Sequence, residues 1–179
     1  MSVRALHLLG SPVLRARAAE VGRPDDDVAT LVGDLFDTMR AAQGVGLAAN
    51  QVGVARRVAV VDTGEDDPPI VLIDPVILER YGLAKSEEGC LSIPDLYGDV
   101  ERATRVVIET TTAAGARERV EALDLRARAV QHEIDHLDGI LFIDHLSPLK
   151  RQLLMRRWRK QRTGEPGYLK ELPPAPARG

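Results

Sequence analysis

Residues 132–136 read His-Glu-Ile-Asp-His, within a stretch from 124 to 137 in which apolar residues recur at helical spacing. An HExxH sequence on a helix places its two imidazoles one turn apart on the same face, so His132 and His136 can bind one metal ion. Glu133 then lies beside that ion, where it can accept and donate protons. Because the pattern has only three fixed positions, alone it indicates a metal site without deciding what the site does.

The chain's only cysteine, Cys90, is the candidate for a third ligand. A lone cysteine is most often a small buried hydrophobe. This one lies in Glu88-Gly89-Cys90-Leu91-Ser92, where the sequence is about to leave a strand and Gly89 lets the backbone approach closely. Three protein ligands leave the fourth position of a tetrahedral ion for water, which is typical of catalytic rather than structural zinc sites.

Residues 44–51 read Gly-Val-Gly-Leu-Ala-Ala-Asn-Gln and form a third informative segment. The segment lacks the Gly-Lys-Ser/Thr ending of a phosphate loop and the strand and helix that frame a dinucleotide fingerprint. A run of small residues that ends in a glutamine suits a peptide-binding groove instead. A bare backbone can pair with an extended substrate while the Gln51 amide reaches the reacting carbonyl.

The composition is that of an ordinary globular protein, and 179 residues suit one domain with a real core. A net charge of -3 argues against nucleic-acid binding over the whole surface, and no apolar run is long enough to span a membrane. With one cysteine, nothing points to a secreted, disulfide-stapled fold. The N-terminus carries arginines without acids, as transit peptides do, but Gly10-Ser11-Pro12 interrupts it and no cleavage site follows. We therefore expect a cytoplasmic protein.

Helical and β-strand patterns follow one another along the chain. Helices are predicted over 25–42, 124–137 and 147–162, the first with aspartate N-caps and the last opened by Ser147-Pro148. Strands are predicted over 57–61, 70–73, 106–112 and 117–123, with a hairpin turn at 113–115. The order helix, strands, helix, helix predicts an α+β domain.

Together, the three segments resemble the motifs of the peptide deformylase family, metalloenzymes that remove the N-formyl group from the starting methionine of nascent chains. The family's GxGxAAxQ loop, EGC(L)S strand and QHExDH helix correspond to 44–51, 88–92 and 131–136. Each motif alone is weak, but the three in the family's order and spacing are highly specific. The likeness spans roughly residues 3 to 150. It implies antiparallel sheets packed around a central HExxH helix, with an N-terminal and a C-terminal helix.

The chain is expected to divide into a domain and a tail. We expect one catalytic domain over residues 1–165. A Pro-rich tail over residues 166–179 is expected to be flexible.

The resemblance assigns the metal ligands and the metal. Cys90, His132 and His136 would hold one divalent ion, with water in the fourth place. The family metal is ferrous iron in cells, and zinc, nickel or cobalt readily replace it. A thiolate ligand leaves the metal a softer site and makes an iron site vulnerable to oxidation at both the iron and Cys90.

The resemblance further implies the catalytic groups. Glu133 would be the general acid and base, and the Gln51 side chain and the Leu91 backbone N–H would stabilise the oxyanion. Metal-activated water would attack the formyl carbon, and formate and a free N-terminal methionine would be released.

The substrates implied are formyl-methionyl nascent peptides. Five residues are expected to contact them: Gly44, Val45, Gly46, Leu125 and Ala129. Arg126 and Arg128 stand where some relatives carry apolar side chains that shape the methionine pocket, so the side-chain preference of this chain is left open.

The stretch 150–162 carries seven cations and no acid, although the whole chain is acidic. A charge run is usually a solvated face. This basic run is set apart from the acidic remainder of the chain, which supports the hypothesis that residues 150–162 dock on ribosomal RNA near the peptide exit. The C-terminal helix does so in some deformylases. We expect no membrane and no DNA partner.

Two other functions remain open from the residues alone. An HExxH metallopeptidase would need a third His or Glu ligand downstream, and His145 is available, although the spacing His-x-x-Gly-x-x-His is absent. Otherwise we expect His145 and His7 to be ordinary structural residues. A closed structural metal site would need a fourth protein ligand, and there is no second cysteine to supply it.

Overall fold

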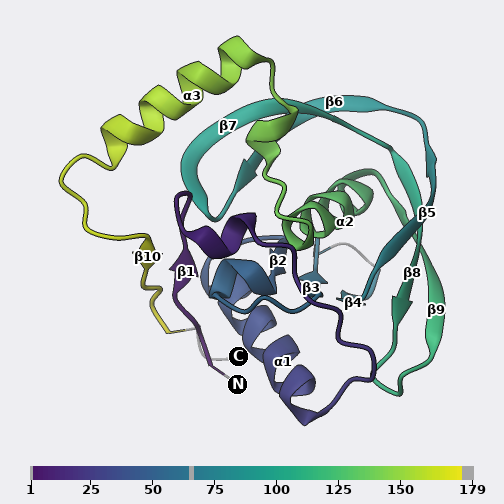
Figure 1. Cartoon of the computed structure of the whole chain (residues 1–179). Coiled ribbons are helices and arrows are strands. Elements are labelled where there is room, and N and C mark those ends of the chain that lie inside the picture. The colour runs from purple at the N-terminus through teal and green to yellow at the C-terminus, as the bar shows by residue number, and fades with distance from the viewer. Residues whose placement is uncertain (1, 65–66, 175–179) are drawn as a thin grey trace.

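Helix α2 (Asp124–Leu137), which carries the HExxH sequence, runs through the centre of the molecule (Figure 1). The computed structural model describes residues 2–64 and 67–174. Ten of the fourteen residues of α2 are buried, so it is a core helix rather than a surface helix with a chance motif. Small residues such as Ala127 and Ala129 allow its neighbours to approach closely.

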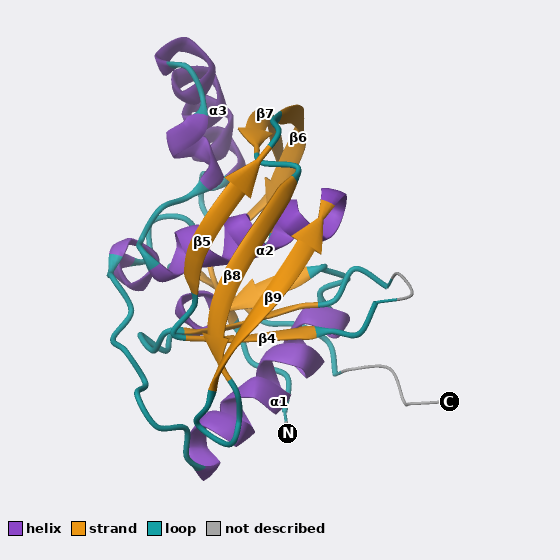
Figure 2. Ribbon diagram, turned by 90° about the vertical axis from the view of Figure 1, so that its right-hand side faces the viewer, coloured by secondary structure: helices purple, strands orange, loops and turns teal. Residues whose placement is uncertain are grey.

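Two three-stranded antiparallel sheets pack against α2. The first consists of β2 (Gly46–Ala48), β3 (Val58–Val61) and β4 (Ile70–Ile73), and the second of β5 (Val76–Tyr81), β8 (Arg105–Thr111) and β9 (Arg117–Leu123). Figure 2 shows the second sheet as a layer in front of the helix. The core between them is built from the β-branched runs of β3 and β8 and the apolar face of α2.

Helix α1 (Asp26–Ala41) lies on the other side of β2 and β3. Its N-cap is Asp25, whose side chain accepts a hydrogen bond from the Val28 N–H at 2.9 Å. Leu31, Leu35 and Met39 recur at helical spacing and are buried against the strands. α1 therefore holds in place the strand that lines one side of the site.

A long hairpin of β6 (Ala84–Cys90) and β7 (Ile93–Arg102) curves over α2 (Figure 1). Cys90 pairs with Ile93 at the closed end of the hairpin, and the register shifts between Glu88 and Cys90. Such an irregularity bends a strand and re-aims its side chains. The sequence indicates a strand that ends near Cys90 but not this return strand, because the exposed, charged positions of the hairpin obscure its alternation.

Helix α3 (Pro148–Gln161) projects along the outside of the molecule and is anchored by buried Leu154 and Trp158. A fourth, two-stranded sheet then pairs β10 (Leu169–Lys170) with β1 (Leu6–His7). Three short 3-10 helices complete the described chain: η1 (Pro12–Arg15), η2 (Ala49–Val52) and η3 (Phe142–His145). Of the tail that we expect to be flexible, residues 175–179 lie outside the described residues, so that expectation stays a prediction.

The structure confirms the α+β class and the three predicted helices, whose ends differ by one residue at most from the predicted ranges once caps are counted. The strands predicted over 57–61, 70–73, 106–112 and 117–123 are also present. In the described part of the chain, no helix has both the length and the apolar character needed to cross a membrane.

Candidate metal centre and peptide pocket

α2 and the end of β6 bring together Cys90, His132 and His136. Nε2 of His132 and Nε2 of His136 are 3.0 Å apart, and Sγ of Cys90 lies 3.3 Å from Nε2 of His136. All three potential ligand atoms lie within 4.8 Å of one another. Among the described residues, this is the group of His, Cys and acidic side chains whose geometry can hold a metal ion.

Local structure explains this convergence. The two histidines are four residues apart on a helix and so face the same side, with their ring centroids 4.8 Å apart. Cys90 reaches them from the hairpin. A methyl group at the preceding Gly89 would come within 2.8 Å of the exposed Tyr97 ring, which would have to shift. Glycine before the cysteine therefore lets the backbone lie close to Tyr97.

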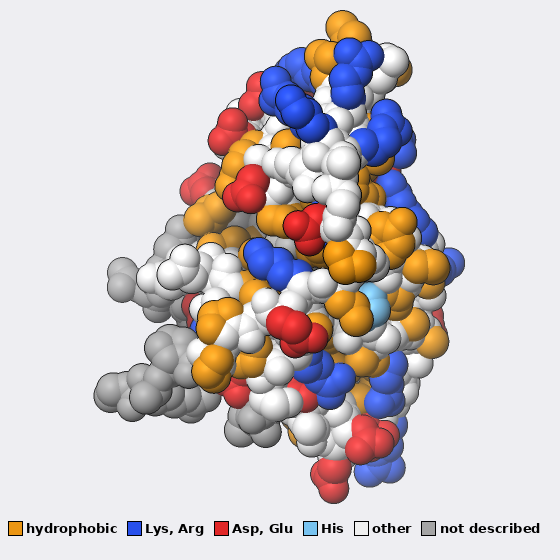
Figure 3. Space-filling model, turned by 90° about the vertical axis from the view of Figure 1, so that its left-hand side faces the viewer, with side chains coloured by type: hydrophobic (Ala, Val, Ile, Leu, Met, Phe, Trp, Pro, Cys, Tyr) orange, Lys and Arg blue, Asp and Glu red, His pale blue; other side chains and the backbone are white. Residues whose placement is uncertain are grey.

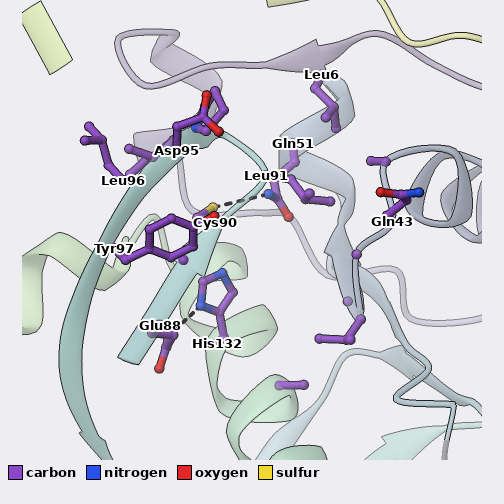
Figure 4. Close-up of a pocket in the computed structure, with 18 of the residues that line it drawn as sticks. Leu6, Gln43, Gln51, Glu88, Cys90, Leu91, Asp95, Leu96, Tyr97 and His132 are labelled. Atoms are coloured by element: carbon purple, nitrogen blue, oxygen red, sulfur yellow. Dashed lines mark hydrogen bonds and ion pairs between the residues drawn. The ribbon is translucent and has the colours of Figure 1, made fainter. Parts of the chain in front are cut away.

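Glu88 orients the first histidine. Its carboxylate accepts a hydrogen bond from Nδ1 of His132 at 2.6 Å (Figure 4), so Nε2 is the ring nitrogen turned towards Cys90 and His136. Burial alone would raise the pKa of Glu88, but hydrogen bonds from His132 and Arg102 hold that pKa well below its ordinary value. The carboxylate is thus a buried anion held in place by its partners.

Glu88 is itself fixed by two arginines. Arg102 donates to its two oxygens at 2.8 and 3.2 Å, and Arg128 donates to it at 2.9 Å. Arg102 also pairs with Asp135 at 2.6 Å, which ties β7 to α2. Arg102 is not singled out by the sequence, and Glu88 and Asp135 are known from it only as parts of motifs.

The donor set fits a metal ion. Burial, together with the neighbouring His132, holds the pKa of His136 well below its ordinary value, so this imidazole is neutral as a ligand must be. Nδ1 of His136 is buried with no partner in the described structure, so the ring has no competing hydrogen bond that would turn Nε2 away. One sulfur and two ring nitrogens are ligands that zinc and iron accept.

Glu133 lies beside the same group and is buried. A methyl group at Gly46 would overlap its Oε1 and lie 2.9 Å from its Cδ, so the glycine makes room for the carboxyl group. Its Oε2 has no hydrogen-bond partner among the described residues. Burial raises the pKa of Glu133 to about 7, although the positive charge of His132 opposes the shift. The group can therefore gain or lose a proton near neutral pH.

Gln51 approaches from the other side, on η2. Its Oε1 accepts the Ala48 N–H at 3.0 Å, which fixes the orientation of the amide. Its Nε2 donates to Ser92 Oγ at 3.1 Å. The same nitrogen lies 3.5 Å from Cys90 Sγ (Figure 4). The amide N–H groups thus face the candidate metal centre.

A pocket of about 750 Å³ opens onto these residues. One side is formed by Gly44, Val45 and Gly46, and another by Leu125 and Ala129 of α2. All five residues expected to contact substrate therefore line one cavity together with Cys90, His132, Glu133 and Gln51. Tyr97, which the sequence does not single out, is an exposed aromatic lining residue of the same pocket (Figure 4).

Leu91 follows the cysteine and packs across the pocket. A methyl group at Gly44 would lie 2.7 Å from Leu91 Cδ1, so this glycine and leucine are in contact across the groove. Residues 44–46 and 87–91 therefore line one pocket and touch at Gly44 and Leu91.

The two arginines that leave the side-chain preference open, Arg126 and Arg128, differ in their surroundings. Arg126 pairs with Asp67 at 3.2 Å and donates to the Pro68 carbonyl, away from the pocket. Arg128 borders the pocket, but its guanidinium is held by Glu88 and by the Val100 carbonyl, each at 2.9 Å.

The two remaining histidines lie outside the candidate centre. His145 Nε2 contacts Asp135 Oδ2 at 2.8 Å and does not belong to the group of Cys90, His132 and His136. His7 Nδ1 contacts Ser11 Oγ at 2.8 Å. The arrangement therefore offers the metallopeptidase alternative no third histidine, and the described residues offer a closed structural site no fourth ligand.

Comparisons with known proteins agree with this geometry. The family model described as polypeptide deformylase matches residues 3–152. A peptide deformylase of Alkalilimnicola ehrlichii is 49% identical over 162 residues, which cover 89% of this chain and 91% of the relative. Peptide deformylase 1 of Clostridium acetobutylicum is 47% identical over 147 residues, 82% of this chain and 97% of the relative.

Solved structures show the same similarity. A peptide deformylase from Legionella pneumophila superposes with a TM-score of 0.84 at 40% identity, covering 91% of this chain and 97% of its own. One from Ehrlichia chaffeensis, solved in complex with actinonin, has a TM-score of 0.84 at 34% identity, covering 90% of this chain and 98% of its own.

Proposed function

Because this chain belongs to the polypeptide deformylase family, a family of metal-dependent enzymes, we propose that it removes the N-formyl group from formyl-methionine at the start of nascent polypeptides and releases formate. One observation carries the proposal: a thiol and two imidazoles converge beside a pocket of about 750 Å³, which Cys90 and His132 line together with a buried carboxyl group and an amide donor. A cysteine ligand, in place of a third histidine or glutamate, separates this site from those of ordinary zinc peptidases.

Cys90, His132 and His136 would hold one divalent ion, ferrous iron in the cell, with zinc, nickel or cobalt as replacements. Such an ion lowers the pKa of a bound water towards roughly 7 and polarises a carbonyl oxygen. Glu88 supports the ligand set because it fixes the ring of His132 from behind.

Glu133 would move the proton. Its carboxyl group takes a proton from the attacking water and delivers it to the amine of the departing peptide. Its buried, unpartnered Oε2 and its pKa of about 7 support both halves of this cycle.

Gln51 and Leu91 would stabilise the negative oxygen that forms when water adds to the formyl carbon. The Gln51 amide is oriented towards the centre by Ala48 and Ser92, so little reorganisation accompanies the reaction. Each such donor typically contributes roughly 3 kcal/mol to the transition state.

The substrate backbone would pair with the edge formed by Gly44, Val45 and Gly46, and the methionine side chain would lie against Leu125 and Ala129. A formyl carbon carries only a hydrogen, so a tight pocket at the centre excludes an acetyl group by size. An acetyl group would overpack the space at the centre, which is costly because the surrounding groups are buried and close-packed.

The decisive experiment measures formate release from formyl-Met-Ala-Ser by the purified protein, with its metal content determined. We expect metal-dependent release, loss after chelation, and recovery on adding ferrous iron or nickel. Acetyl-Met-Ala-Ser serves as the matched substrate and is expected to remain intact. A folded, metal-loaded protein that releases no formate would refute the proposal.

The site of action would be the ribosome in the cytoplasm. Basic side chains gather over α3 on the face shown in Figure 3. Within the run 150–162, Arg156, Arg157, Arg159 and Lys160 are exposed. Phosphate contacts by such cations would bind RNA in a salt-dependent manner.

Ribosome binding can be tested with a chain that ends at Leu149 and with Arg156→Glu/Arg159→Glu. Both are expected to weaken binding at physiological salt, whereas the matched reversal Arg17→Glu/Arg23→Glu elsewhere on the surface is not. Unchanged affinity of the α3 variants would remove the ribosome from the proposal.

A further inference from the structure

The segment 169–173, here called the C-terminal segment, returns to the catalytic pocket from the far end of the chain. Its strand β10 pairs with β1, with Lys170 opposite Leu6, and the Leu8 N–H donates to the Tyr168 carbonyl at 2.7 Å. Figure 1 shows β10 beside β1. Four residues of the segment line the same pocket as Cys90 and Glu133: Lys170, Glu171, Leu172 and Pro173.

Contacts between side chains give the pocket an inner and an outer end. At the inner end, Glu133 lies against Gly46. Two residues earlier in the chain, Gly44 lies against Leu91, whose Cδ1 would be 2.7 Å from a methyl group there. Leu6, which pairs with Lys170 of the C-terminal segment, also lines the pocket and lies on the opposite side of Cys90 from His132 (Figure 4). The C-terminal segment therefore borders the end of the pocket away from Glu133.

The direction of the groove indicates which part of a substrate reaches this end. Glu133 and Leu172 line one pocket of about 750 Å³. An extended peptide advances about 3.3 Å per residue, so each successive residue lies further from a formyl group held beside Glu133. The residues that reach the outer end therefore lie downstream of the methionine.

We propose that the C-terminal segment is the outer wall of the peptide groove and selects substrates with an apolar side chain downstream of the methionine. The inference rests on the deformylase function proposed above. Leu172 is only partly buried, and with Leu6 and Leu91 it presents an apolar surface to the pocket. A substrate side chain of matching character removes this surface from water.

The test compares formyl-Met-Ala, which we expect to be too short to reach Leu172, with formyl-Met-Ala-Ser-Leu. Leu172→Ala is expected to lower kcat/KM for the tetrapeptide about five-fold through KM, because part of a leucine contact is lost, and to leave the dipeptide unchanged. A chain that ends at Tyr168 is expected to show the same or a larger change in the ratio of the two kcat/KM values. Leu169→Ala is the matched control, since Leu169 is exposed on the same strand and does not line the pocket.

The outcomes separate this inference from the proposed function. If neither peptide yields formate with the full chain, the deformylase function itself fails. If the dipeptide is cleaved but Leu172→Ala keeps the wild-type ratio of tetrapeptide to dipeptide, the C-terminal segment does not contact substrate. The inference is also overturned if Leu169→Ala changes the ratio of the two kcat/KM values as much as Leu172→Ala does. It is likewise overturned if the truncated chain cleaves both peptides faster by the same factor. If the truncated chain does not fold, the two point variants decide.

Discussion

Glu88 and His132 are joined by a 2.6 Å hydrogen bond between a buried carboxylate and a ring nitrogen that faces away from the candidate metal centre. The carboxylate decides which nitrogen of His132 carries the proton, and so which one is free to bind metal. Arg102 and Arg128 hold the carboxylate in turn, so the orientation of a ligand on α2 depends on side chains from β6 and β7.

Replacing Glu88 should therefore weaken metal binding. Glu88→Gln loses the anionic acceptor and leaves Arg102 and Arg128 without this carboxylate partner, so metal affinity is expected to fall by about 10- to 100-fold. Competition with a chelator, read as bound metal per chain, measures the change. Glu87→Gln is the control, because Glu87 is exposed and adjacent. Equal affinity of Glu88→Gln and the wild type would show that the hydrogen bond does not support the ligand.

Glu133→Ala should separate metal binding from turnover. Glu133 is not among the three converging ligand residues, so the variant is expected to retain its metal, while kcat falls by at least about 10²- to 10⁴-fold for want of a proton carrier. Metal analysis and formate release on the same sample make the comparison. Near-wild-type turnover would remove Glu133 from the mechanism.

Gly46→Ala should impair catalysis through packing alone. The new methyl group would overlap Oε1 of Glu133, so the carboxyl group must move from its place beside the centre. We expect a loss of kcat of about 10²-fold, as a misplaced catalytic group typically produces, with metal content unchanged.

Gly98→Ala is the matched control for this change. Its methyl group would meet the end of the Leu146 side chain, 2.8 Å away and outside the pocket, and that side chain can shift. Comparable activity in the two alanine variants would contradict the packing argument.

Asp34 should contribute to stability in a pH-dependent way. Burial alone would raise the pKa of Asp34, but hydrogen bonds from Arg4 at 2.8 Å and the Ser2 N–H at 2.6 Å lower it. A carboxyl group whose pKa is lower in the folded state stabilises the fold at pH values above its unfolded pKa, about 3.9. This contribution is lost as the pH falls through the folded value.

Asp34→Asn should therefore reduce the free energy of unfolding at pH 7 by about 1–2 kcal/mol, and its difference from the wild type should shrink below about pH 4. Urea unfolding at pH 7, 4 and 3 measures the difference. Glu165→Gln, an exposed carboxyl substitution, is expected to show no such trend. A difference that stays constant with pH would show that the Asp34 carboxylate does not provide the stabilisation.

The elements that the sequence predicted share a strong local signal. Residues 124–137 and 26–41 combine helical periodicity with capping residues, and 58–61 and 70–73 are short β-branched runs, so local chain preference and burial point the same way. The hairpin of β6 and β7 lacks such agreement. Its outer positions are charged and exposed, and its curvature depends on what it covers.

The same contrast holds for the site. Three motifs locate Cys90, His132, Glu133 and Gln51 from the sequence, because the spacing of residues on a helix or strand is a local property. Arg102 carries no such signal. Its importance comes from its place in space, where it meets Glu88 from a position 14 residues along the chain.

By itself, the sequence predicted the fold class and the helix with its two histidines on one face, because both follow from local periodicity and short-range spacing. The family was indicated by the resemblance of three motifs in their order along the chain. Only the tertiary structure decided that Cys90 lies within 3.3 Å of His136, that Gly46 leaves room for Glu133, and that Leu172 returns to the same pocket. These relationships join segments far apart in the chain. They depend on how strands pair and pack around α2, which local patterns leave open.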